Sequence, residues 1–251
     1  MKTKIILLTS VAILGSLILH AQTASGATTG FSQGISSNGV QVDLQTFQNS
    51  QLTSKDATEP VGVDGTPFLF ETYMPAEIYF LNSDQEPIRY NLNYNIYADL
   101  MKMSDSNEDT GEVKALPKGA NYEVVMGNKN FRYMSFEADG EVFNNYVEIL
   151  DVYENGDALV LRRSQEIQQA QSSGSTYSTP KNARLKSNDV FYYIDRDGYA
   201  FEMENHKRKV MDEMSGAAEK KVKNYIKENN IRFDDDLRGL KGVAKYYSSI
   251  K

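Results

Sequence analysis

The 251-residue chain contains no cysteine, no tryptophan and only two histidines, His20 and His206. Without cysteine it can form neither a disulfide framework nor a thiolate metal site, so its stability must come from a buried core. If His20 leaves with an export signal, a zinc site built from several histidines is excluded within one chain, and a Ser-His-Asp triad would have to use His206. That residue precedes a run of Lys and Arg, where we expect a solvated helix start rather than a catalytic base.

Positive charge is also scarce. Lys and Arg total 27 against 34 Asp and Glu, a formal charge of −7 that becomes −9 when Lys2 and Lys4 are removed. An acidic chain is poorly suited to nucleic acid or to an anionic membrane surface, both of which favour dense Lys and Arg. We therefore expect no nucleic-acid partner. After the N-terminus no apolar run is long enough to cross a bilayer as a helix, so we expect no transmembrane segment in the mature chain.

The N-terminus has the pattern of an export signal. Lys2 and Lys4 precede a mostly apolar run, Ile5–Leu19, of about fifteen residues, which suits a signal h-region and is shorter than a membrane span. The small residue Ala21 marks the expected cleavage site. Residues 1–21 are thus predicted to be a signal peptide, and the mature protein to be periplasmic, associated with the outer membrane, or extracellular.

Composition divides the remaining chain into four parts. Residues 22–60 are rich in Ser, Thr, Gly and Gln and predict a flexible lead, because such a segment buries too little apolar surface to offset its ordering entropy. Residues 61–165 predict an antiparallel β region. Residues 166–183 are again polar and predict a connector loop, and residues 184–251 predict a β-hairpin followed by helices.

The β region reads as a meander. In Ile88–Tyr97, apolar and aromatic residues alternate with Arg and Asn, a period of two that predicts one buried and one solvated face. The dipeptides Gly127-Asn128, Asp139-Gly140 and Asn155-Gly156 separate later apolar runs and favour hairpin turns. The further runs are Thr66–Glu71, Ala76–Leu81, Leu100–Met103, Glu112–Leu116, Tyr122–Met126, Phe131–Phe136, Val142–Val152 and Ala158–Arg162.

The C-terminal part predicts a second hairpin and three helices. Asp195–Gly198 separates the strands Val190–Ile194 and Tyr199–Met203. In the last helix, apolar residues at spacings of three and four form a stripe that we expect to dock on the sheet, and Asp234, Asp235 or Asp236 is expected to cap it. The expected helices are Lys207–Met214, Ala217–Asn229 and Asp235–Ser249, and the stripe consists of Leu237, Leu240, Val243, Ala244 and Tyr247.

Carboxylates are the remaining source of acid–base chemistry. Two Asp or Glu residues would suffice for a glycosidase-like hydrolase. Glu148, between Val147 and Ile149, comes closest to a carboxylate set in an apolar strand, but alternation predicts that its neighbours face the core while Glu148 faces water.

Two stretches resemble calcium loops. Asp105–Gly111 has oxygen ligands at its first, third and fifth positions, but its glycine falls one place late and the twelfth position is Leu116 instead of the bidentate Glu. Asp195 and Asp197 share a loop, yet Asp197-Gly198 is explained by turn geometry alone. We interpret both as solvated turns, and predict no metal or cofactor.

The chain has 16 tyrosines and 11 phenylalanines. The adjacent pairs Tyr192-Tyr193 and Tyr246-Tyr247 must each point their rings apart, so one member of each pair is a candidate for an exposed sugar-binding or protein-binding face, although core packing with a polar tip is the commoner use.

Several segments in this order resemble a family of exported proteins. The strand Tyr90–Tyr97, the hairpin strand Phe191–Ile194, the ending Asn224–Asn230 and the pair Tyr246-Tyr247 are similar to a set of uncharacterised exported proteins of Bacteroidota-type bacteria, over about residues 60–251. The resemblance implies an envelope location and no established activity, and it carries over no catalytic or binding residue.

The expected fold is α+β: an antiparallel meander, as a curved sheet or a partly closed barrel, with the C-terminal hairpin and helices packed on it. The leading functional hypothesis is a non-catalytic module of the cell envelope that binds or helps assemble another envelope protein. A secreted hydrolase with paired carboxylates and a β-barrel that binds a small ligand or saccharide are the alternatives.

Overall fold

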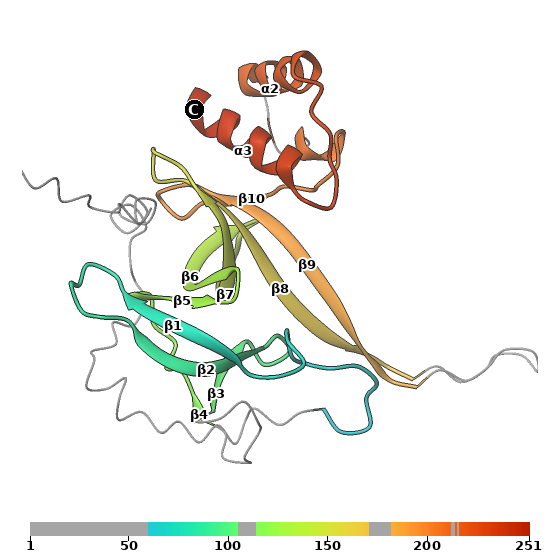
Figure 1. Ribbon diagram of the computed structural model, residues 1–251. Helices are drawn as coiled ribbons and strands as arrows, with labels where there is room; N and C mark the ends of the chain where they lie inside the picture. The colour runs from blue at the N-terminus through green and yellow to red at the C-terminus, as the bar shows by residue number, and fades with distance from the viewer. Residues whose placement is uncertain (1–59, 105–113, 171–181, 212–213, 215) are drawn as a thin grey trace, which may run out of the picture.

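The computed structural model describes residues 60–104, 114–170, 182–211, 214 and 216–251. In these residues ten strands form one antiparallel sheet in the order β10-β9-β8-β7-β6-β5-β1-β2-β3-β4, so consecutive strands are neighbours except where β1 pairs with β5 (Figure 1). The strands are β1 Met74–Phe80, β2 Ile88–Asn95, β3 Leu100–Ser104, β4 Lys114–Ala115, β5 Tyr122–Met126, β6 Lys129–Ala138, β7 Glu141–Val152, β8 Ala158–Gln168, β9 Arg184–Ile194 and β10 Ala200–Glu202.

The sheet is curved and does not close, and helices pack on it, so the expected α+β class is confirmed. The signal peptide and nearly all of the lead lie outside the described residues, as does Asp105–Gly111. No helix in the described part of the chain is long and apolar enough to span a bilayer.

The hairpin turns were predictable from their dipeptides. Asp139 and Gly140 connect β6 to β7 and have φ values of 51° and 77°, the positive values that a two-residue turn of this kind requires. Gly127 and Gly198, at the β5–β6 and β9–β10 turns, also have positive φ. Local chemistry thus sets the strand boundaries over most of the meander.

The sheet buries opposite faces toward its two ends, and β6 is where the change occurs. Phe131, near its start, belongs to one core with β1, β2, β3 and β5, whereas Met134 and Phe136 point to the other side and belong to a second core with β7, β8 and β9. The turn after β2 reaches β7, because Tyr146 N donates to Asp99 Oδ1 at 3.0 Å. At the other end, Glu137 N donates to Gly198 O at 2.9 Å. Each half therefore curls until its end touches the middle strands, while the sheet as a whole remains open.

The second half of the polar face of β2 is buried rather than solvated, whereas Arg89 is exposed as expected. Asn93 and Asn95 were expected in water, but they are 3% and 1% exposed because the segment before β1 crosses over them. The Asn93 amide accepts from Phe70 N at 3.2 Å and donates to Phe70 O at 2.8 Å, so it replaces the lost water.

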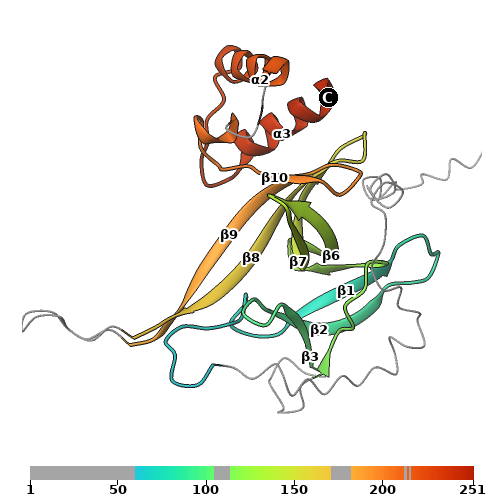
Figure 2. The ribbon, with the colours of Figure 1, turned by 180° about the vertical axis from the view of Figure 1, so that it is seen from behind.

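Strands β8 and β9 are longer than the sequence suggested. Residues 166–168 were assigned to the connector, but β8 runs to Gln168 and pairs with β9 from Arg184 onward. Beyond Arg162, β8 pairs with β9 alone, and the two form a ribbon that projects from the body (Figure 2). Its side chains are largely polar and it contacts the segment at Asp64 and Thr66 rather than a core, so the apolar period that marks a strand is missing.

The C-terminal helices pack on the face of β8 and β9 that is opposite to the second core. Leu240, Val243 and Ala244 are fully buried in a third core together with Leu159 and Tyr193, which confirms the expected stripe. The elements are a 3-10 turn, η2 Lys209–Met211, and the helices α2 Gly216–Glu228 and α3 Arg238–Ile250.

The start of α3 differs from the expectation. The helix begins at Arg238, later than expected, and Leu237 takes the N-cap position in a left-handed conformation with φ 61° and no side-chain cap. Asp236 nevertheless accepts from Arg238 N at 3.0 Å. The aspartates therefore shape the turn before the helix instead of capping it.

Candidate functional site at the β9–β10 turn

The turn between β9 and β10 is held rigidly by one aspartate. Asp195 Oδ1 accepts from both Asp197 N and Tyr199 N at 3.0 Å, and the backbone closes the loop through Gly198 N to Asp195 O at 3.0 Å. The expectation that Asp195 and Asp197 reflect turn geometry is consistent with these bonds, since Asp195 bonds the backbone of its own turn.

A second turn meets the first. Asp157, between β7 and β8, is 2% exposed, and its carboxylate accepts from Tyr193 OH, from Asn155 Nδ2 at 2.9 Å and from Arg196 N at 3.1 Å. Burial first, and then the hydrogen bond to Asp157, raise the pKa of Tyr193 above its ordinary value, so this phenol stays a donor. The buried carboxylate joins the two turns.

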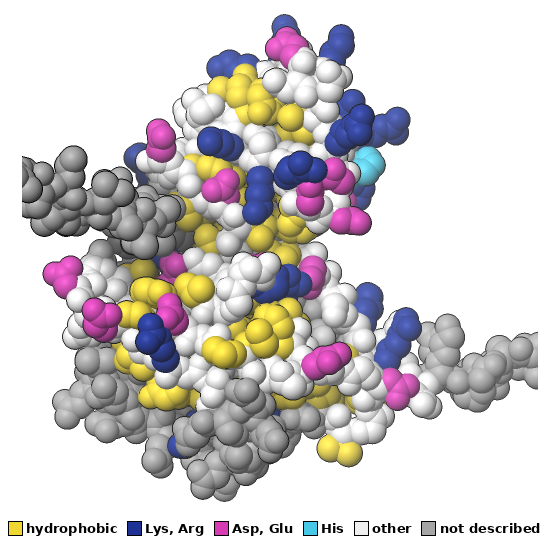
Figure 3. Space-filling view, viewed as in Figure 1, with side chains coloured by type: hydrophobic (Ala, Val, Ile, Leu, Met, Phe, Trp, Pro, Cys, Tyr) yellow, Lys and Arg dark blue, Asp and Glu magenta, His cyan; other side chains and the backbone are white. Residues whose placement is uncertain are grey.

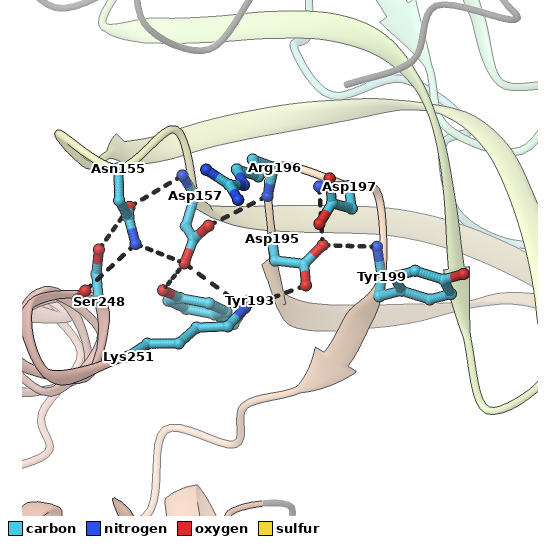
Figure 4. Close-up of polar contacts among 9 residues, drawn as sticks. All are labelled: Asn155, Asp157, Tyr193, Asp195, Arg196, Asp197, Tyr199, Ser248 and Lys251. Carbon is cyan, nitrogen blue, oxygen red and sulfur yellow. Dashed lines mark hydrogen bonds and ion pairs between the residues drawn. The ribbon is translucent and has the colours of Figure 1, made fainter. Parts of the chain in front are cut away.

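The end of α3 completes the arrangement (Figure 4). Ser248 Oγ donates to Asn155 Oδ1 at 2.7 Å. Lys251 Nζ lies 3.1 Å from Asp195 Oδ2 and 3.8 Å from Asp157 Oδ2. Two turns and one helix end, which are far apart in the chain, are thus fixed in a single polar network.

This network borders a hollow of about 360 Å³. Within the described residues, three side chains of the turn make no hydrogen bond or ion pair: the Arg196 guanidinium and the Asp197 carboxylate, which line the hollow, and the Tyr199 hydroxyl, which does not. Tyr199 is 63% exposed. A rigid turn therefore presents an exposed cation and anion at the hollow, and the Tyr199 ring points away from them on the same turn (Figure 4). The lining residues are Asn155, Asp157, Asp195, Arg196, Asp197 and Lys251.

The chemistry open to this arrangement is recognition more readily than proton transfer. The hydrogen bonds of the Asp157 side chain are all ones that its carboxylate accepts, which suits a structural acceptor. Among the residues that the structure describes, no three acidic or histidine side chains are grouped so that they could hold a metal ion.

His206 lies on the exposed segment after β10. Its Nδ1 accepts from Arg208 N at 3.3 Å, and its own amide donates to Glu204 O at 2.7 Å. The hydrogen bonds shape the local turn, and His206 belongs to none of the polar contacts drawn around the hollow.

Glu148 was expected to face water, and this was wrong. Its side chain is 8% exposed and forms ion pairs with Lys129 at 2.7 Å and Arg163 at 2.8 Å. The reason is the change of buried face near the middle of the sheet: both Glu148 and its neighbour Val147 are covered, on opposite sides of β7. Lys129 and Arg163 provide the positive charges that stabilise this buried acidic side chain.

The tyrosine pairs follow the commoner use, core packing, rather than forming an exposed face. Tyr192 and Tyr193 are 6% and 0% exposed, because they point into two different cores on opposite faces of β9. In the second pair, Tyr246 stacks on Tyr225 with 4.1 Å between ring centroids, and Tyr247 packs edge-on against Tyr193 at 5.0 Å. Neither pair supplies the exposed ring.

The exposed tyrosine of the turn is Tyr199, which the sequence predicts only as the first residue of a strand. The signal that could have identified it is an aromatic residue directly after an Asp-Gly turn.

No protein-family model, curated protein or solved structure matches the chain.

Proposed function

We propose that this chain is an exported, non-catalytic protein of the cell envelope that binds or helps to assemble another envelope protein, and that the β9–β10 turn is its contact site. The observation that carries the proposal is the rigid turn with three uncommitted side chains. Tyr and Arg are the residue types that most often dominate the energy of protein interfaces. Asp195 holds the turn before any partner arrives, so little conformational entropy remains to be lost on binding.

Charge favours a partner with an acidic surface. Residues 204–251 contain 12 Lys and Arg against 8 Asp and Glu, although the whole chain is acidic. Lys and Arg side chains are frequent on the helical part of the surface in Figure 3. Because α3 ends beside the turn, an acidic partner would meet attraction from the helices as well as from Arg196.

The proposed location rests on the N-terminal sequence. The positive residues, the short apolar run and the small residue Ala21 support cleavage after residue 21 and an envelope or extracellular destination. Mass spectrometry of the native protein should find Gln22 at or close to its N-terminus, and an intact Met1 would contradict export by cleavage.

Site-directed photocross-linking in cells that export the full chain tests the contact site. A photoreactive amino acid at position 199 should give a discrete adduct that also contains a second protein. The matched control is position 61, because Val61 is 96% exposed in the segment before β1, which meets β9 at Arg184, the end of the strand away from the β9–β10 turn. Arg196→Ala should remove the adduct formed from position 199 while the melting temperature stays unchanged. Equal adducts from both positions, or none from position 199, would contradict the proposal.

One observation favours a second function. Asp157 and Asp195 approach the same ammonium group beside a hollow, and two carboxylates are what a glycosidase-like hydrolase needs. On this alternative, Asp195→Asn would abolish hydrolysis, whereas Tyr199→Ala would impair it little. Assays on glycoside substrates with these two variants separate the functions.

A further inference from the structure

A second hollow lies on the face of the sheet opposite the core that β1, β2, β3 and β5 share. It has a volume of about 490 Å³ and is formed where β5, β1 and β2 lie side by side. The side chains of Ile78, Leu92 and Val124 point into the core. Their strand neighbours Glu77, Asn91 and Val125 therefore point outward, into this hollow. Its lining residues are Pro75, Ala76, Glu77, Arg89, Tyr90, Asn91, Val125 and Gly127.

An ion pair is fixed at its wall. Glu77 and Arg89 are directly opposite on β1 and β2, with 2.9 Å between Arg89 Nε and Glu77 Oε1. The other carboxylate oxygen of Glu77 accepts from Tyr79 OH. The hydrogen bond from Tyr79 and then that from Arg89 lower the pKa of Glu77, which keeps the pair charged.

Polar groups in the hollow remain available. Arg89 uses only Nε in its hydrogen bond, and its side chain is 77% exposed, so the two terminal nitrogens face solvent. The Asn91 amide makes no hydrogen bond with any described residue, and it offers both a donor and an acceptor. Pro75 and Val125 provide apolar surface between these groups, and the ring of Tyr79 is 39% exposed beside Glu77.

These features select among ligand classes. The charges of Glu77 and Arg89 cancel. An anion would be repelled by Glu77 about as much as Arg89 attracts it, and the reverse holds for a cation, so neither gains net attraction. A neutral polyhydroxylated ligand gains from donors and acceptors together, and its C–H faces can pack on Pro75, Val125 or Tyr79. The volume lies in the range of sites for small ligands. We infer that this hollow on β1, β2 and β5 binds a neutral saccharide.

The test uses the full mature chain and an array of immobilised neutral and acidic oligosaccharides, followed by titration with the best neutral oligosaccharide in solution. Binding to the array alone would indicate a surface-attached glycan as the source, and binding in both formats a free saccharide as well. Wild-type protein should bind neutral members, and Arg89→Ala and Asn91→Ala should each weaken binding about tenfold or more.

Lys186→Ala is the matched control, because Lys186 forms a similar exposed cross-strand pair with Glu166 at 3.2 Å on the distant ribbon. It should leave saccharide affinity unchanged, as should Arg196→Ala, so the outcome is independent of the proposed protein contact. The inference is overturned if no neutral oligosaccharide binds, if only acidic ones bind, or if Arg89→Ala binds as tightly as wild type at an unchanged melting temperature.

Discussion

Two buried tyrosines show how a hydrogen-bond partner decides whether a buried hydroxyl stabilises the fold. The Tyr193 hydroxyl donates to Asp157, whereas the Tyr153 hydroxyl is buried without a hydrogen-bond partner among the described residues. The two rings stack with 6.0 Å between centroids, so both lie in the same core.

We predict opposite effects from removing these hydroxyls. Tyr193→Phe should lower the free energy of unfolding by about 1–3 kcal/mol, because a buried carboxylate loses a donor. Tyr153→Phe should leave it unchanged or raise it by up to about 1 kcal/mol, because an unsatisfied polar group is removed. Urea denaturation measures both, and an equal loss in the two variants would contradict this account of the network.

Alkaline pH should unfold the protein. Burial is the main cause that raises the pKa of several tyrosines, and the rise is large in five of them, Tyr94, Tyr122, Tyr146, Tyr153 and Tyr193. A folded pKa above the unfolded value of about 10 means that the folded state retains the proton, so this stability is complete below pH 10 and is lost as pH rises further. Each such tyrosine should remove about 1.4 kcal/mol per pH unit above that value.

The measurement is tyrosinate absorbance and circular dichroism followed together during an alkaline titration. These tyrosines should ionise in one cooperative step that coincides with unfolding. Ionisation of all 16 tyrosines near pH 10 with the fold intact would contradict the burial of the five.

At the scale of elements, two glycines of α3 distinguish close packing from helix propensity. A Cβ at Gly239 would lie 1.9 Å from Arg232 O, whereas one at Gly242 would meet only the Tyr225 hydroxyl, at 3.9 Å. Gly239→Ala should therefore destabilise the protein by about 1–3 kcal/mol or more. Gly242→Ala should stabilise it by up to about 1 kcal/mol, because alanine is the better helix former. Thermal denaturation compares them, and a tolerated Gly239→Ala would show that α3 is not held against residue 232.

What could be predicted from the sequence was local. The alternation in Ile88–Asn95 and the Asp139-Gly140 turn place strands and a hairpin because each pattern lies within a few neighbouring residues. The ribbon of β8 and β9 was not predicted as strand because its side chains are largely polar and show no apolar alternation. The burial of Glu148 also escaped prediction, because it depends on the sheet changing its buried face, which no single strand reports.

The candidate site escaped for the same reason. Asn155 and Ser248 are 93 residues apart in the chain, and nothing near either one indicates that they meet. The Asp195–Gly198 turn itself was predictable, but its role depends on Asp157 and Lys251 arriving from two other elements. A short-range pattern thus identified the turn and not the network of the candidate site.

At the scale of the whole molecule, charge separates the two parts. The helical segment is basic and the remainder is acidic, so association with an acidic partner should weaken as salt screens the attraction. The hollow on β1, β2 and β5 and the β9–β10 turn lie on different elements, which allows each to be altered while the three cores stay intact.

The affinity of the partner captured through position 199 tests the central claim most directly. Titration of that purified partner with wild-type protein and with Tyr199→Ala should show about a tenfold or greater loss of affinity in the variant, with the same melting temperature. Unchanged affinity, with wild type and variant equally folded, would contradict the assignment of the β9–β10 turn as the binding site.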